Sequence, residues 1–147
     1  MKHKNALYPD GRLTQNSGVR MLLKCLFGGI AYGLLEILWR GYTHPSMVLT
    51  GGVCFAMICG VNRRFSDKPL LVRGVMCALA VTAVELCVGM LVNQWLHLDV
   101  WDYSDQQLHL FGQICLLYTG LWFGLSLVLC FTLSKMRFRA ISVNLQK

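Results

Sequence analysis

The sequence predicts an all-α membrane protein, a four-helix transmembrane bundle with both termini on the cytoplasmic side. Three observations lead to this prediction. Charged residues make up 14% of the 147 residues, against roughly 25% in an average soluble domain. The apolar residues gather in four long runs. The basic residues lie almost entirely in segments that a four-span arrangement puts on one side of a bilayer.

The four apolar runs are near the length of about 20 residues that a helix needs to cross the hydrocarbon layer. The second is the shortest, and Pro45 and Pro69 precede the second and third runs, where the first turn of a helix tolerates proline. The predicted spans are residues 21–39, 47–61, 70–95 and 110–133. We therefore expect a polar N-terminal segment over 1–20, a transmembrane domain over 21–134 and a basic tail over 135–147.

The basic residues predict the orientation, because short loops rich in Lys and Arg stay in the cytoplasm. Thirteen of the fourteen lie in or beside the N-terminal segment, the middle loop and the tail, and Arg40 alone falls on the other side. The opposite side carries Asp99, Asp102 and Asp105. The net charge of +7 is thus a topology signal, and we expect a lipid bilayer and not nucleic acid as the surroundings of this chain.

Small residues recur at helical spacing within each predicted span. Close packing of helices in lipid depends on such residues, so we interpret them as packing faces of the bundle, with a specific dimer motif as the alternative. In the third span the stripe also contains polar residues and lies on one helix face. The positions are Gly29 and Gly33, then Gly52, Ala56 and Gly60, then Gly74, Ala78, Thr82, Glu85, Gly89 and Asn93, and finally Gly120 and Gly124.

Glu36 and Glu85 are the acidic residues inside predicted spans, in the outer halves of the first and third. A charged carboxylate there costs at least ~2.5 kcal/mol unless it is paired. Arg40 follows Glu36 by four residues, so the two can form an ion pair of structural or functional importance. Glu85 has no basic residue within one turn. We expect it to face the bundle interior, with a buried structural hydrogen bond as the alternative to a functional role.

These residues predict a polar cavity that opens to the outer side, with Glu85 at its floor. Asp102 would lie at the mouth, in an outer loop whose Trp101 and Tyr103 would sit at head-group depth; an ordinary interfacial loop is the alternative. The candidate substrate-binding residues are Glu85, Glu36, Arg40, Asn93, Asp102 and Gln113.

Most familiar catalytic and cofactor motifs are missing. The sequence has no phosphate-binding loop of the Walker type, no nucleophile elbow and no zinc-protease helix. His44, His97 and His109 match no metal-ligand spacing, and the seven cysteines form no CxxC pair. We therefore expect no metal, no cofactor and no disulfide framework, with the cysteines acting as small packing residues.

Two stretches resemble a known family. The first runs from Tyr32 to Gly41 with His44, Ser46-Met47 and Gly51-Gly52; the second contains Glu85, Gly89, Asn93, Trp101-Asp102-Tyr103-Ser104 and Gly112-Gln113-Ile114-Cys115. Over residues 20 to 130 the chain resembles the bacterial proteins named Putative ABC-transporter type IV. The resemblance implies a membrane subunit of a transport system in a bacterial plasma membrane. Because this chain has no ATP-binding motif, a separate chain would supply the ATPase.

Three functions remain open from the sequence. The first is a permease-like transport protein, with homo-oligomers providing a pathway that four helices alone make narrow. The second is an enzyme at the outer membrane face, with Glu85, Asp102 and Glu36 as acid and base. The third is a non-catalytic partner that stabilises or regulates another membrane protein through its small-residue faces.

Overall fold

The protein folds into four long helices, confirming the predicted fold class. The structure is a computed structural model that describes residues 17–145, with side chains through residue 136. Most of the predicted segment 1–20 and the last two residues of the predicted tail lie outside the described residues. The elements are α1 (Ser17–Arg40), α2 (Pro45–Arg64), α3 (Leu70–Gly89), η1 (Met90–Trp95), β1 (His109–Leu110), β2 (Ile114–Cys115) and α4 (Leu116–Leu145).

The first two helices begin and end where local chemistry allows. Gly41 closes α1 with a positive φ of 82° and donates its N–H to the Ile37 carbonyl at 2.8 Å, which is a common way for a helix to stop. His44 caps α2, because its Nδ1 accepts the Ser46 N–H at 3.3 Å. Pro45 then occupies the first helical position, which tolerates proline.

The third span is a helix of two kinds. The regular helix α3 passes at Met90 into η1, a π-helix that continues the same rod to Trp95. The Leu96 N–H bonds to the Leu91 carbonyl at 2.9 Å and so closes a wider turn. Such wide turns are rare and recur at functional sites. Here η1 places Asn93 where it can bond to the loop that follows.

The start predicted for the fourth span at residue 110 is wrong, because α4 begins at Leu116. Residues 109–115 instead form the short antiparallel pair β1–β2, with His109 opposite Cys115. Phe111 and Gly112 turn the chain with φ values of 53° and 68°, which no α-helix contains. Leu110, Phe111, Ile114 and Cys115 are apolar, so this run reads as a continuation of the helix after it.

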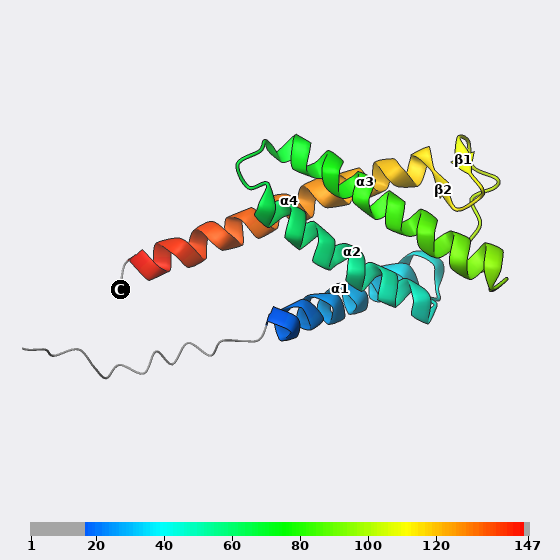
Figure 1. Cartoon of the computed structure of the whole chain (residues 1–147), viewed down its shortest axis with the longest axis horizontal. Helices are drawn as coiled ribbons and strands as arrows, with labels where there is room; N and C mark the ends of the chain where they lie inside the picture. Colours follow the sequence, from blue (N-terminus) through cyan, green and yellow to red (C-terminus); the bar gives the residue numbers. More distant parts are fainter. Residues whose placement is uncertain (1–16, 146–147) are drawn as a thin grey trace, which may run out of the picture.

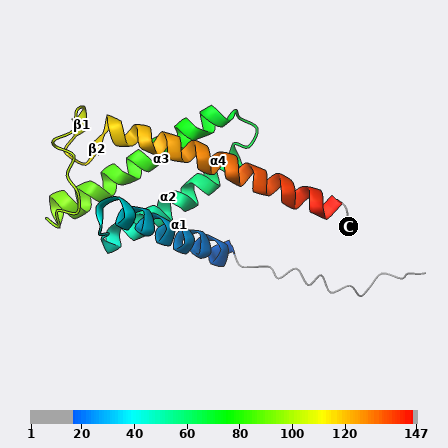
Figure 2. The ribbon, with the colours of Figure 1, turned by 180° about the vertical axis from the view of Figure 1, so that it is seen from behind.

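The helices form two hairpins, and α2 lies between α1 and α3 (Figure 1). The start of α1, the α2–α3 connection and the end of α4 lie at one end of the molecule, which we call the terminus end. The α1–α2 connection and residues 96–115 lie at the other, which we call the loop end. Seen from behind, α4 also extends past the other helices at the terminus end (Figure 2).

Glycines bring α1 and α2 into close contact, as predicted. A Cβ on Gly52 would overlap the Cys25 carbonyl, and one on Gly29 would lie 2.6 Å from the Val48 carbonyl oxygen. Gly74 packs α3 against α4 through Leu127 in the same way. The prediction is wrong for Gly60 in α2, because a Cβ there would meet no atom within 4 Å. It is also wrong for α4, because the same holds for Gly120 and Gly124. These two glycines lie on an outer face of the described chain.

The core is small and the outside of the bundle is apolar. Cys54, Ile58, Cys77, Val81 and Cys130 form one buried cluster, and all seven cysteines are free. Large apolar side chains face outward instead; Leu38, Leu49, Leu79 and Val128 are 84, 70, 62 and 62% exposed. A soluble monomer rarely exposes such a belt. With four helices long and apolar enough to cross a bilayer in the described part of the chain, this is a multi-pass membrane protein.

Candidate functional site

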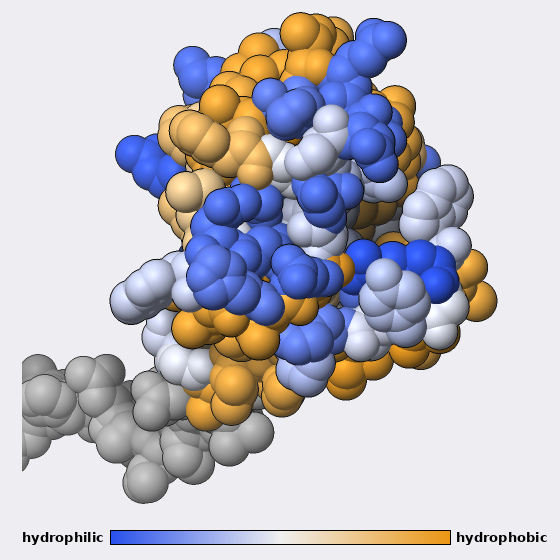
Figure 3. All heavy atoms as spheres, turned by 90° about the vertical axis from the view of Figure 1, so that its right-hand side faces the viewer, coloured by the Kyte–Doolittle hydropathy of each residue, from blue (hydrophilic) through white to orange (hydrophobic). Residues whose placement is uncertain are grey.

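Most of the buried polar side chains of the bundle lie toward the loop end. Viewed toward that end, hydrophilic side chains occupy the middle of the surface and hydrophobic ones its edges (Figure 3). Beneath this surface lie Glu36 and Glu85, which are the buried carboxylates of α1 and α3. We treat this region as the candidate functional site.

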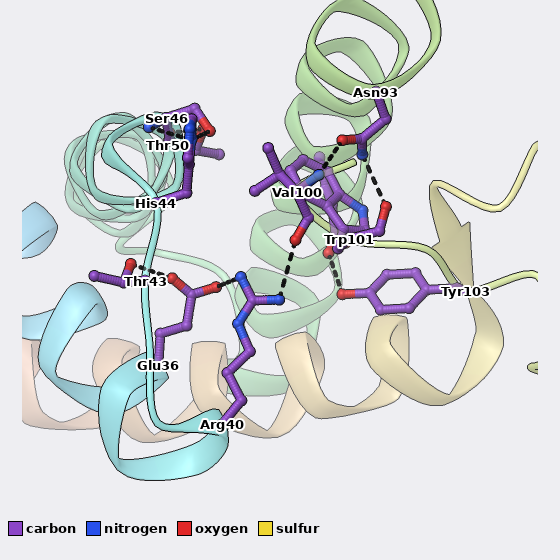
Figure 4. A network of polar contacts seen from close by, with 11 residues as sticks. Glu36, Arg40, Thr43, His44, Ser46, Thr50, Asn93, Val100, Trp101 and Tyr103 are labelled. Carbon is purple, nitrogen blue, oxygen red and sulfur yellow. Dashed lines mark hydrogen bonds and ion pairs between the residues drawn. The ribbon is translucent and has the colours of Figure 1, made fainter. Parts of the chain in front are cut away.

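Glu36 is held by partners from its own hairpin (Figure 4). Its Oε1 lies 2.6 Å from Arg40 Nη2, and its Oε2 accepts the Thr43 hydroxyl. Arg40 in turn donates to the Val100 carbonyl at 3.3 Å and stacks over the Tyr42 ring at 4.6 Å. The predicted Glu36–Arg40 ion pair is thus present, and it also ties α1 to the loop between η1 and α4.

Glu85 has two aromatic hydrogen-bond donors in place of a cation. The Tyr103 hydroxyl donates to its Oε1 at 3.1 Å, and Trp122 Nε1 donates to its Oε2 at 2.8 Å. No lysine or arginine forms an ion pair with it in the part of the chain that the structure describes. Burial raises the pKa of the Tyr103 phenol, and the nearby Glu85 carboxylate raises it further. Tyr103 therefore stays a neutral donor.

Asn93 and Gln113 fold the loop between η1 and α4. Asn93 Nδ2 donates to the Trp101 carbonyl at 2.9 Å and to Gln113 Oε1 at 2.7 Å, while its Oδ1 accepts the Val100 N–H at 2.7 Å. Gln113 Nε2 donates to the Phe111 carbonyl at 3.0 Å. These bonds use most of the hydrogen-bonding groups of the two amides. We call this set of contacts the amide clamp.

Trp101 and Tyr103 do not point out of their loop as interfacial anchors would, because both rings turn toward the interior of the bundle. The Trp101 side chain is buried beneath the loop and its Nε1 donates to the Gln113 carbonyl at 3.0 Å. Tyr103 points inward to Glu85 and stacks on Tyr118 with ring centroids 4.3 Å apart. The physical reason is that both rings find buried hydrogen-bond partners, which an interfacial position would leave to water.

Asp102 faces outward and shapes a turn. Its Oδ1 accepts the Ser104 hydroxyl at 2.6 Å and the Ser104 N–H at 2.9 Å. These two hydrogen bonds hold the pKa of Asp102 below its ordinary value, and the bond from the hydroxyl has the larger effect. A Cβ on Gly112 would lie 2.5 Å from the same carboxylate oxygen, so this turn requires a glycine beside it.

Two adjoining cavities of about 270 and 330 Å³ lie among the helices near this end. The first has Glu85 and Ser126 in its wall, and the second, nearer the loops, has Glu36 and Arg40. Both are mostly aromatic and aliphatic, not polar as predicted, since the walls they share are Tyr32, Leu35, Met47, Trp101, Trp122 and Leu125. Asn93, Asp102 and Gln113 bond to other residues of the loop region, so the walls are formed by helix side chains and by Trp101 and Tyr103.

The predicted binding residues thus divide into two groups. Glu85, Glu36 and Arg40 line the cavities, while Asn93 and Gln113 form the amide clamp and Asp102 its neighbouring turn. Sequence reasoning missed the cavity roles of Tyr32 and Trp122, whose rings face each other at 5.8 Å between α1 and α4. The signal available was an aromatic residue at mid-span in each helix, which is also typical of ordinary packing.

A separate polar cluster joins three helices at the terminus end. Arg73 on α3 donates to Asn62 on α2 and to Ser134 Oγ on α4, the latter at 2.9 Å. Ser134 Oγ also donates to the Cys130 carbonyl at 2.7 Å. Neither of the two cavities reaches this cluster, so its visible role is to hold the helices together.

Metal binding has no support in the geometry. Within the described residues, no group of three or more His, Cys, Asp or Glu side chains lies close enough together to hold a metal ion. His44 is engaged instead in the cap of α2, with its Nδ1 2.8 Å from Ser46 Oγ.

Comparison with known proteins places the chain in one family. Residues 36–146 match the family described as Putative ABC-transporter type IV. This match covers more than half of the chain, so the protein belongs to that family, a class of transport-related membrane proteins, as the resemblance implied. No curated protein and no solved structure matches it. The function of the chain must therefore be argued from its own cavities.

Proposed function

We propose that the protein is a permease-like membrane subunit of a transport system whose intramembrane carboxylates line the substrate cavity. The observation that carries this proposal is the position of Glu85. It lies in the wall of a cavity to which all four helices contribute, and it has two hydrogen-bond donors but no cationic partner among the described residues. A carboxylate retained in such a place is a frequent mark of a substrate or proton pathway.

The position of the second cavity supports a substrate pathway that opens toward the outer side of the membrane. Its walls include Trp39 and Arg40 from the end of α1, with Tyr103 and Tyr118 from the loop end. With basic residues concentrated at the terminus end, the positive-inside rule puts that end in the cytoplasm of a bacterial cell and the loop end outside. A cysteine introduced after Arg64 should therefore react with an impermeant reagent only after the cells are lysed. A cysteine introduced after Asp99 should react in intact cells.

The family membership supports a separate ATPase chain as the energy source. The sequence itself contains no phosphate-binding loop. Copies of this chain would assemble around the pathway, because four helices alone enclose little space. Purification in mild detergent should then yield an ATP-hydrolysing subunit together with more than one copy of this protein.

The experiment that tests the proposal does not depend on the identity of the substrate. A strain that lacks the protein is complemented with the native chain, with Glu85→Gln or with Asp67→Asn, and small molecules are measured in cells and medium. Asp67 is an exposed carboxylate near the α2–α3 connection, so its variant is matched in charge. We expect at least one compound to be redistributed by the native chain and Asp67→Asn but not by Glu85→Gln. Identical profiles with all three proteins present at equal abundance in the membrane would contradict the proposal.

A further inference from the structure

The cavity walls are unusually rich in aromatic rings. Tyr32, Trp101 and Trp122 line both cavities, and Trp39, Tyr103 and Tyr118 line the second. Aromatic faces carry partial negative charge and attract cations that lie within about 6 Å of the ring centre. The second cavity already borders one such contact, since the Arg40 guanidinium lies 4.6 Å from the Tyr42 centroid.

The charged side chains of the walls are Glu36, Arg40 and Glu85, and their balance is negative. Glu36 is neutralised by Arg40 at 2.6 Å, whereas Glu85 has no counter-ion within the described part of the chain. Its two donors occupy one acceptor position on each carboxylate oxygen, and each oxygen has a second. An anion would therefore be repelled by the uncompensated carboxylate and by the negative ring faces. A neutral molecule would leave that carboxylate without a counter-charge in a medium of low dielectric.

Ser126 provides an independent sign that the first cavity accommodates a ligand. Its side chain is 1% exposed and belongs to the cavity wall, and its hydroxyl has no hydrogen-bond partner. A buried hydroxyl without a partner is costly. A hydroxyl on a helix commonly bonds to the carbonyl four residues earlier, as Thr132 and Ser134 do in α4. The Ser126 hydroxyl is thus available to a molecule in the cavity.

The flank of the bundle provides a route for apolar molecules. Phe27 and Leu35 on α1 and Leu121 on α4 line the cavities and are 64, 52 and 53% exposed. The cavities therefore open between α1 and α4, within the belt that faces lipid. A molecule that partitions into the bilayer can reach Glu85 by this path without crossing the loops.

On these observations we propose that the cavity binds an apolar quaternary ammonium compound, with the cationic nitrogen near Glu85 and the rings of Tyr32 and Trp122. A quaternary nitrogen needs no hydrogen-bond acceptors, and apart from Glu85 this wall offers few. The compound donates no proton, so the Ser126 hydroxyl bonds to water or to an acceptor elsewhere on the ligand. The inference rests on the proposed transport function and names its substrate class.

The test uses the full-length protein in nanodiscs of zwitterionic phosphatidylcholine, with binding measured by isothermal titration calorimetry. Benzyltrimethylammonium is the cation, and 2,2-dimethylpropylbenzene is its neutral counterpart of the same shape. We expect the cation to bind at least about tenfold more tightly than the neutral compound, as cation–π and ion-pair contacts in a desolvated site predict. Glu85→Gln should weaken cation binding about tenfold or more, and the matched Asp67→Asn should leave it unchanged.

A second pair of variants keeps the carboxylate and tests the rings. Tyr32→Phe retains the aromatic face and should preserve cation binding, whereas Tyr32→Leu should weaken it by a factor of several. This pair decides the matter if Glu85→Gln does not fold. Equal affinity for both compounds, or a cation affinity that neither Glu85→Gln nor Tyr32→Leu lowers, would overturn the inference and assign the cavity to a neutral chain such as a lipid tail. The redistribution experiment on cells would still decide the transport function separately.

Discussion

Glu36 and Glu85 occupy comparable places in the two hairpins, yet their partners differ in kind. Glu36 in α1 has an ion pair with Arg40 and a hydroxyl from Thr43, both supplied by residues within seven positions of it. Glu85 in α3 has only neutral donors, and both come from other segments, the loop between η1 and α4 and the helix α4. Equal burial therefore does not imply an equal role. The charge of Glu36 is compensated inside the hairpin, and that of Glu85 is open to a ligand.

The backbones of the two hairpins differ in a related way. Helices α1 and α2 approach so closely that Gly29 and Gly52 touch backbone carbonyls of the facing helix. Gly74 of α3 meets side chains of α4, and the amide clamp joins η1 to the segment that precedes α4 at the loop end. The first hairpin thus forms a tightly packed wall. The second supplies both donors to the carboxylate that faces the cavity, directly or through its connecting loop.

The largest expected effect is on the close contact of the first hairpin. Gly52→Leu places a side chain where the Cys25 carbonyl lies, and a backbone atom cannot move aside as a side chain can. We expect a loss of about 3 kcal/mol or more of unfolding free energy, measured by thermal unfolding in detergent. Gly60→Leu on the same helix is the matched control, because nothing lies within 4 Å of its Cβ position. Similar melting temperatures for the two variants would show that the helices can separate without cost.

The next effect tests whether Glu36 is compensated within the chain. Arg40→Gln leaves its carboxylate buried without a cation and removes the bond to the Val100 carbonyl. Breaking a fully buried pair costs about 3–5 kcal/mol. Because Arg40 is 23% exposed, we expect a destabilisation of about 2 kcal/mol. The double variant Glu36→Gln with Arg40→Gln should recover part of this loss. Additive losses from the two single variants would contradict the pairing.

Glu85 should behave differently from Glu36 in the same assay. A glutamine at position 85 can accept the Trp122 N–H through its oxygen and donate to the Tyr103 oxygen through its nitrogen, so both contacts remain, with the Tyr103 hydroxyl as acceptor. We expect Glu85→Gln to change the unfolding free energy by less than about 1 kcal/mol. A loss as large as that of Arg40→Gln would show that the Glu85 charge is itself structural, and the contrast between the two glutamates would disappear.

The number of helices and most of their ends were predictable because they depend on local and additive properties. Runs of apolar residues of bilayer length, with prolines before two of them, mark α1, α2, α3 and α4. The ion pair was also predictable, since Glu36 and Arg40 are four residues apart on one helix. These features need only the periodicity of an α-helix and the cost of a charge in hydrocarbon.

The features that the sequence did not predict depend on contacts between distant segments. The break before Leu116 arises because Gln113 bonds to Asn93, twenty residues earlier. The aromatic lining of the cavities arises because Tyr32 and Trp122 meet across helices that lie ninety residues apart in the chain. Which face of α4 its glycines occupy is likewise decided by the tilt of α4 against α3, which spacing along one helix cannot reveal.

The smallest expected effect concerns the outward face of α4. Gly120 and Gly124 contact nothing in the described chain, in contrast to Gly52 in the first hairpin. Gly120→Leu should therefore leave the melting temperature unchanged or raise it slightly, because glycine is about 0.8–1 kcal/mol less favourable in a helix than alanine and leucine ranks close to alanine. The same purified protein, run on a sizing column with light scattering, reports its assembly state. If Gly120→Leu lowers the melting temperature and also splits an assembly into single chains, a second copy covers this face. The glycines of α4 would then pack between copies, and those of the first hairpin within one chain. If both measurements stay as in the native protein, the face meets lipid, and close glycine packing is confined to the contacts described within the chain.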